Sequence, residues 1–205
     1  MDSSVLFVQW QNYAPLANTE FCTAAFNQAV EAYRQAHRHY HTLRHIQSML
    51  RLLDESGFMR EEVFWATWFH DYVYDPQRSD NEEASAVAAH HGLLILGVPS
   101  PCIDATVKLI LATKLHEVGA RPEHEQAFLD ADMAILGAPA EIYDEYAANV
   151  RKEFSMYPDD QYRVGRARFI EKTLQGGEIF GTGWFRARFE QWARTNLERE
   201  LSVLA

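Results

Sequence analysis

The segment EEVFWATWFHDYVYD, residues 61–75, constrains the fold more than any other part of the chain. It is apolar almost all round, so a helix built from it has no polar face to turn toward water. Such a helix must lie centrally, covered by other helices. An ionised carboxylate inside it costs several kcal/mol to bury without a partner, so the adjacent His70 and Asp71 need an explanation.

Helical spacing of apolar residues recurs along the rest of the chain, and stretches with the alternating pattern of a β-strand are missing. We find no internal repeat and no Pro/Gly/Ser-rich linker that would divide the chain. The sequence therefore predicts one all-α domain. Its helices, about nine in number, are expected at residues 18–37, 43–56, 61–75, 79–97, 100–114, 128–137, 141–154, 161–174 and 184–200.

The charge balance excludes several classes of partner. A net charge of −10 repels polyanions, so we expect neither duplex nucleic acid nor an acidic membrane surface as a partner. A small phosphorylated substrate stays compatible, because a bound divalent cation reverses the local field. Asp2 stands where a signal peptide has positive charge, and no apolar run is long enough to span a membrane. The two cysteines, Cys22 and Cys102, offer no disulfide framework and fit a reducing compartment. We expect a cytoplasmic protein.

A metal ion is a natural partner for the buried His70-Asp71 pair. Neighbours on a helix point about 100° apart, so both can reach an ion on one face, with His45 and Asp132 approaching from other helices. Two imidazoles and two carboxylates leave positions for water and substrate, and they suit Mn, Fe, Co, Ni, Zn or Mg. The spacing alone also allows His70 and Asp71 to pair with each other or with an arginine.

The order His45, His70-Asp71 and Asp132 resembles the H...HD...D signature of the HD superfamily of metal-dependent phosphohydrolases. The segment YHTLRH, residues 40–45, is similar to the YHNxxH motif of cyclic nucleotide phosphodiesterases, with Thr42 in place of asparagine. The longer series YHTLRHI, WFHDYVYD, NEEASA, ATKLH, FLDADMAILG and YRVGR looks like a bacterial group of predicted HD phosphohydrolases. The resemblance implies one HD-type helical bundle over residues 1–205, with a metal-binding core at about 37–137 that residues 138–205 complete.

The resemblance also implies roles for single residues. His45, His70, Asp71 and Asp132 would bind the metal, with Asp132 preferred to Asp130 because the ligand in the HD pattern normally follows an alanine. His41, the first histidine of YHTLRH, would act as the general acid toward the leaving oxygen, beside Asp71 as the second catalytic residue.

Further ligands are open alternatives. Dinuclear members of the superfamily place extra histidines where this chain has His90, His91 and His116, and Asp71 would then bridge two metal ions. The same histidines can equally face solvent or cap a helix end.

Substrate contacts are predicted from residue chemistry alone. The candidates to clamp phosphate oxygens are basic side chains, since forked guanidinium donors match that geometry, although exposed solubilising charge explains any one of them as well. Glu82 could orient the attacking water, but Ser79 and Glu82 also have the form of a capping box. The basic candidates are Arg38, Arg44, Lys114 and Arg166.

These features predict a phosphomonoesterase or phosphodiesterase that acts on a small phosphate ester, such as a nucleotide, by attack of metal-activated water, with one or two divalent ions. The alternatives are a dinuclear-iron oxygenase and a non-catalytic nucleotide-binding or regulatory metal module. An alarmone hydrolase is disfavoured, because Tyr74 replaces the glutamate of HDxxED. The aromatic last helix, with Trp184, Phe185, Phe189 and Trp192, is expected to pack in the core, with a homodimer interface as the alternative.

Overall fold

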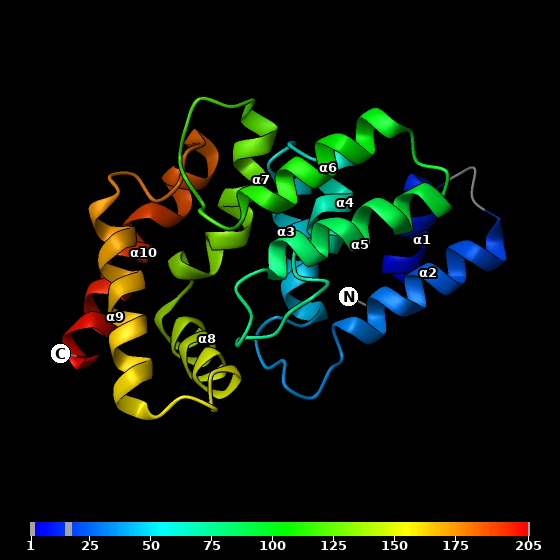
Figure 1. Ribbon diagram of the computed structural model, residues 1–205. Coiled ribbons are helices and arrows are strands. Elements are labelled where there is room, and N and C mark those ends of the chain that lie inside the picture. The colour runs from blue at the N-terminus through cyan, green and yellow to red at the C-terminus, as the bar shows by residue number, and fades with distance from the viewer. Residues whose placement is uncertain (1–2, 15–17, 205) are drawn as a thin grey trace. The chain divides into compact units, whose positions relative to one another are not determined.

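The computed structural model describes residues 3–14 and 18–204, where the regular structure is entirely helical (Figure 1). In these ranges, no helix combines the length and the apolar character needed to cross a membrane. The helices are α1 (Ser3–Tyr13), α2 (Thr19–Ala32), α3 (Leu43–Glu55), α4 (Glu61–Phe69), α5 (Asn81–Ile95), α6 (Ser100–Ala112), α7 (Glu123–Met133), the 3-10 helix η1 (Ala134–Gly137), α8 (Ala140–Glu153), α9 (Asp159–Gln175) and α10 (Gly183–Leu204).

The all-α prediction is confirmed, and the predicted count of about nine helices is wrong by one. The described residues form ten α-helices, and the additional one is α1. Its sequence gives a weak signal, since Leu6 and Trp10, four residues apart, are its fully buried side chains. The chain divides into two compact units, Met1–His116 with α1 to α6 and Glu117–Ala205 with α7 to α10. The single-domain organisation stays a prediction.

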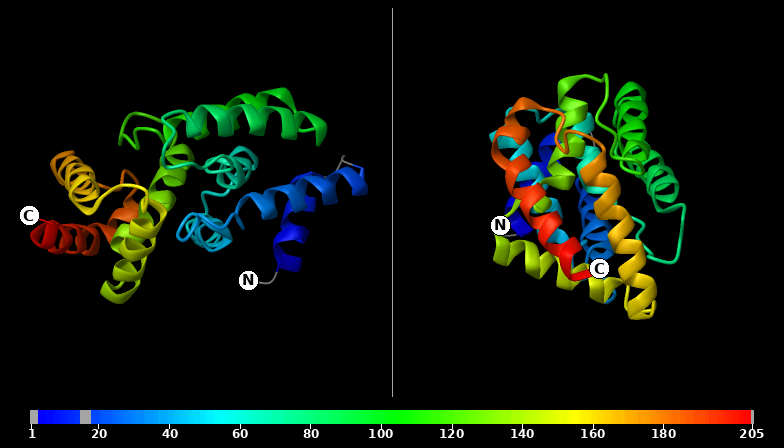
Figure 2. Two further views of the ribbon diagram at one scale, coloured as in Figure 1. Left: turned by 60° about the horizontal axis from the view of Figure 1, so that its bottom comes forward. Right: turned by 90° about the vertical axis from the view of Figure 1, so that its left-hand side faces the viewer.

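Helix α4 is the central helix of the first unit. Every residue from Val63 to Phe69 is buried, as expected for a segment without a polar face. Helices α3, α5 and α6 all pack against α4, and α5 and α6 lie side by side in each view (Figures 1 and 2). The central position predicted for this segment is confirmed.

Large aromatic rings fill the space between α4 and the N-terminal helices. The ring of Trp10 from α1 meets Trp65 edge-on at 4.9 Å between centroids and Trp68 at 5.0 Å. Phe26 from α2 packs against both Trp10 and Trp68. Edge-to-face pairs of this kind add about 0.5–1.5 kcal/mol each to the free energy of burial, so this cluster fixes α4 firmly in place.

The predicted helix over residues 61–75 is too long. Helix α4 ends at Phe69, His70 is its C-cap residue and Asp71 lies in the following turn. The amide of Tyr72 donates to the carbonyl of Phe69 at 3.1 Å, a tight i→i+3 bond that closes the last turn. The guanidinium of Arg38 occupies the carbonyls of Asp71 and Tyr72, which a continuing helix would have bonded itself.

The start of the next helix also differs from its prediction. Helix α5 begins at Asn81 with Asp80 as N-cap residue, so Ser79 and Glu82 form no capping box. The side chain of Asn81 instead holds the preceding loop, since it accepts from the amide of Asp75 and donates to its carbonyl.

The second unit is organised around α10, which packs against α7, η1 and α9 (Figure 1). Phe185 is fully buried, which confirms core packing for this part of the aromatic helix, whereas the side chain of Trp192 is 56% exposed. Gly137 lies directly against Phe189, and a Cβ there would come within 2.5 Å of the Phe189 carbonyl oxygen. Only glycine allows η1 to approach α10 this closely.

A buried ion pair links α9 to α10 in the same unit. The guanidinium of Arg166 donates to both oxygens of Glu200 at 2.9 Å, and the hydroxyl of Tyr143 donates to the same carboxylate. Burial alone would raise the pKa of Glu200, but the hydrogen bonds and charge of Arg166 hold that pKa below its usual value.

Glu200→Gln should lower the free energy of unfolding by about 3 kcal/mol at pH 7, because it leaves the Arg166 charge buried without its counter-charge. A carboxyl with a lowered pKa in the folded state stabilises the fold above its unfolded pKa of about 4.3 and loses this contribution as pH falls. The difference in the free energy of unfolding between wild type and variant, measured with urea, should therefore become smaller as the pH is lowered to 3.5. The exposed Glu198→Gln is the matched control; equal differences at both pH values would contradict the assignment.

Candidate metal centre

Two buried histidines face each other in the first unit. His45 lies on the first turn of α3, whose N-cap Thr42 accepts from the amide of Arg44, and His70 is the C-cap residue of α4. Their side chains meet at their Nε2 atoms, which are 3.2 Å apart. Both residues are buried, with 5% and 2% of their surface exposed.

The second ring nitrogen of each histidine has its own partner. His70 Nδ1 lies 3.0 Å from the carbonyl oxygen of Thr67. A carbonyl can only accept, so Nδ1 carries a hydrogen. His70 Nε2 then presents a lone pair in the neutral ring and a second hydrogen in the charged ring. His45 Nδ1 lies 3.2 Å from the hydroxyl of Tyr40, which can either donate or accept. Two lone pairs cannot face each other at 3.2 Å, so either one of the two Nε2 atoms carries a hydrogen or a metal ion lies between them.

Asp71 extends this pair to a third donor. Its Oδ2 lies 3.0 Å from His70 Nε2 and 3.9 Å from His41 Nε2. Metal–ligand bonds of about 2.1 Å place neighbouring ligand atoms about 3.0–3.4 Å apart. The separations of His45 Nε2 and of Asp71 Oδ2 from His70 Nε2 each lie in or near this range. His45 and His70 also belong to a group of side chains whose ligand atoms lie close enough to hold one metal ion, and imidazole ligands suit Zn, Mn, Fe, Co or Ni.

His41 lies at the edge of this group. Its ring packs against Tyr74 at 4.3 Å and against Tyr40 at 4.8 Å between centroids. The side chains of His41 and Asp71 are 21% and 19% exposed, so solvent reaches both. The first unit thus brings together four of the predicted site residues, namely His41, His45, His70 and Asp71, and these four define what we call the histidine cluster.

The predicted phosphate-binding residues lie in different settings. Arg38 is buried and donates to backbone carbonyls, whereas Arg44 is exposed one residue before His45. Lys114 pairs with Glu83 and donates to the carbonyl of Ser79. Arg166 lies in the second unit, where Glu200 occupies its guanidinium.

The extra histidines are not gathered into a site. His90 and His91 are exposed on α5, and His116 follows α6 with a φ of +48°. Within residues 3–14 and 18–204, no group of three metal-binding side chains includes any of them. Glu82 lies half-buried in the first turn of α5.

The two aspartates of FLDADM differ in their surroundings. Asp130 is 1% exposed and accepts from the amides of Gly181 and Thr182 and from the Thr182 hydroxyl, at 2.7–2.9 Å. It thereby caps the start of α10, although burial raises its pKa. Asp132 lies two residues further along α7 and is half-buried. The structural role of Asp130 agrees with the choice of Asp132 as the candidate ligand.

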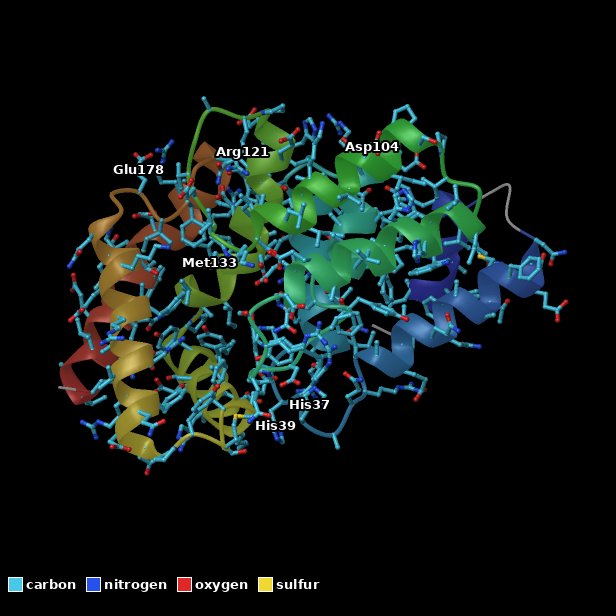
Figure 3. The ribbon with its side chains drawn as sticks, viewed as in Figure 1. His37, His39, Asp104, Arg121, Met133 and Glu178 are labelled. Atoms are coloured by element: carbon cyan, nitrogen blue, oxygen red, sulfur yellow. The ribbon has the colours of Figure 1, made fainter. Side chains whose placement is uncertain are left out.

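Several residues around the histidine cluster were not predicted. Tyr40 and the carbonyl of Thr67 orient the two imidazoles, and the sequence gives a signal only for Tyr40, which lies in the YHTLRH segment. A third residue that was not predicted is His37, which lies, like His39, on the loop between α2 and α3 (Figure 3). His37 Nε2 lies 2.9 Å from the carbonyl of Tyr74, and its ring is parallel to that of Tyr74.

Comparisons with protein-family models, with curated proteins and with solved structures find no match for this chain.

Tyr40→Phe should weaken the binding of a divalent ion about 10-fold, because the Tyr40 oxygen accepts from His45 Nδ1 once His45 Nε2 binds a metal. Isothermal titration with Zn²⁺ or Mn²⁺ measures the change. Tyr13→Phe, which removes a hydroxyl on α1, is the control and should leave the affinity unchanged. Equal affinities for Tyr40→Phe and wild type would contradict this role of the hydroxyl.

Proposed function

We propose that the chain is a metal-dependent phosphohydrolase that acts on a small phosphate ester, of which a nucleotide is one example. The observation that carries the proposal is the pair of buried Nε2 atoms of His45 and His70, 3.2 Å apart, with the Asp71 carboxylate 3.0 Å from His70. Buried imidazoles oriented from behind by a carbonyl and a hydroxyl are the usual arrangement of metal ligands. The HD-superfamily resemblance supports the same conclusion from the sequence.

A divalent ion held by this donor set supplies Lewis acidity and a water molecule whose pKa is lowered toward 7. His45, His70 and Asp71 would hold it, and the resemblance adds Asp132 as a fourth ligand. The mixed nitrogen and oxygen donors fit Mn, Fe, Co, Ni or Zn better than Mg, which prefers oxygen ligands alone.

The charge around the histidine cluster supports an anionic substrate. Residues 32–53 contain four arginines, four histidines and no acidic residue, although the whole chain has a net charge of −10. Arg44 is exposed within this segment and is available to a phosphate group from solvent. Of these arginines, Arg34 pairs with Glu31 and Arg51 with Glu55, so Arg44 is the candidate for contact with a substrate phosphate.

His41 has the position of a proton donor. It is partly exposed, its ring is held between Tyr40 and Tyr74, and its Nε2 is 3.9 Å from the Asp71 carboxylate. A side chain fixed at the rim of the cluster can transfer a proton to a leaving oxygen without itself binding the metal.

The proposal is tested by elemental analysis of protein purified without chelators or a histidine tag, followed by hydrolysis assays with p-nitrophenyl phosphate, bis-p-nitrophenyl phosphate and a nucleotide panel. One or two Mn, Co, Ni or Zn ions per chain with hydrolysis would support it. Two irons with oxygen consumption would favour the oxygenase, and bound metal without turnover would favour a regulatory module. Failure to bind any of these ions would overturn the proposal.

Asp71→Ala should abolish both metal binding and hydrolysis, because it removes a ligand. His41→Ala should keep the metal and lose about 10²- to 10⁴-fold in kcat, the usual contribution of a general acid. Metal content and kcat, measured on the same preparations, separate the two effects. Full activity of His41→Ala would remove the acid role, and His39→Ala, on the same loop, is its control.

Asp132→Asn and Asp130→Asn should have opposite consequences. The first should lower metal affinity with little effect on thermal stability, since Asp132 is proposed as a ligand. The second should lower stability by roughly 1–3 kcal/mol, because the buried donors at the start of α10 lose a charged acceptor. Thermal unfolding and metal titration of both variants decide between the assignments, and a loss of affinity only in Asp130→Asn would exchange the two residues.

A further inference from the structure

Arg38 is a buried cation in an unusual position. It is 5% exposed, and four of its hydrogen-bond acceptors are neutral oxygens. Removing a guanidinium from water costs several kcal/mol, so its burial needs a compensating role. Its forked donors are used within the protein, which does not fit the predicted phosphate clamp.

The acceptors of Arg38 belong to two separate segments. Nη1 and Nη2 donate to the carbonyls of Asp71 at 2.7 Å and Tyr72 at 2.9 Å, in the turn that follows α4. Nη1 also donates to the carbonyl of His41 at 3.3 Å, in the loop that precedes α3. One planar group therefore joins the backbone of the proposed metal ligand to the backbone of the proposed proton donor.

Aromatic contacts make this link rigid. The guanidinium carbon of Arg38 lies 5.0 Å from the ring centre of Tyr33 and 5.3 Å from that of Tyr74. Tyr33 is buried and donates to the carbonyl of Trp68 at 2.8 Å, and Tyr74 packs on the ring of His41. The Arg38 guanidinium thus holds the backbone carbonyl of His41 directly. It also packs on Tyr74, whose ring in turn packs on the imidazole of His41.

We propose that Arg38 is a positioning residue that fixes His41 and Asp71 relative to each other, and that it does not contact the substrate. The inference rests on the proposed function for its catalytic consequence, but the geometry it predicts exists without metal. Stabilisation of the turn after α4 would require only the bonds to the carbonyls of Asp71 and Tyr72. The additional bond to His41 is what assigns the positioning role.

The test compares Arg38→Met and Arg38→Lys with Arg34→Met, an exposed arginine that pairs with Glu31 at the end of α2. In metal-free protein, the ring signals of His41 and His45 in ¹H–¹⁵N spectra should shift or broaden in both Arg38 variants, while those of His90 and His91 stay unchanged. Arg38→Lys keeps the charge without the fork, so it should fail to restore the wild-type signals. If Arg38→Met does not fold, the comparison with wild type is made with Arg38→Lys alone.

With metal, we expect Zn²⁺ affinity to fall at least ~10-fold and kcat for bis-p-nitrophenyl phosphate to fall with little change in KM. Millimolar guanidinium should partly restore both in Arg38→Ala. A raised KM with unchanged kcat would overturn the proposal in favour of a phosphate clamp, and unchanged histidine signals would overturn it outright. If wild type binds no metal, the proposed function fails, and the histidine signals alone decide the role of Arg38.

Discussion

The end of α4 is the point on which the rest of the first unit depends. Residues 63–69 of this helix are buried on every side, and the chain leaves that buried position at a histidine followed by an aspartate. The carbonyls at the end of α4 have partners of their own, since that of Trp68 accepts from the hydroxyl of Tyr33 and that of Phe69 from the amide of Tyr72. Arg38 supplies donors for the turn, and in doing so it brings the loop with His41 next to Asp71. One side chain therefore joins the turn after α4 to the loop that carries His41.

Much of this arrangement could be predicted from the sequence, and the reasons are specific. The apolar surface of residues 61–75 predicted the central helix. The expectation of a carboxylate buried inside that helix was wrong, because Asp71 lies after the end of α4 and its side chain is 19% exposed. Helix α1 was missed because two buried residues, Leu6 and Trp10, are too few for a recognisable periodicity. The end of α4 was placed too late because apolar residues continue beyond Phe69, while the contacts that hold the following turn come from Arg38, more than thirty residues earlier in the chain.

The same reason explains the residues whose roles were assigned differently. Forked donors suit phosphate oxygens and backbone carbonyls equally well, so no sequence pattern separates Arg38, whose acceptors are carbonyls, from the exposed Arg44. In the second unit, Asp130 differs from Asp132 because it accepts hydrogen bonds from the amides of Gly181 and Thr182. These amides lie some fifty residues away in sequence. Local chemistry identified the candidate residues, and only tertiary contacts distinguish their roles.

The packing of α4 also gives the protein an internal optical probe. Trp65 and Trp68 lie on α4 with Trp10 against both, and none of the three is exposed to solvent. Trp68 precedes the candidate ligand His70 by only two residues. Paramagnetic ions such as Co²⁺ and Ni²⁺ quench nearby indole emission, whereas Zn²⁺ does not. The fluorescence of the unlabelled chain can therefore distinguish these classes of ion as they bind, at protein concentrations far below those that calorimetry requires.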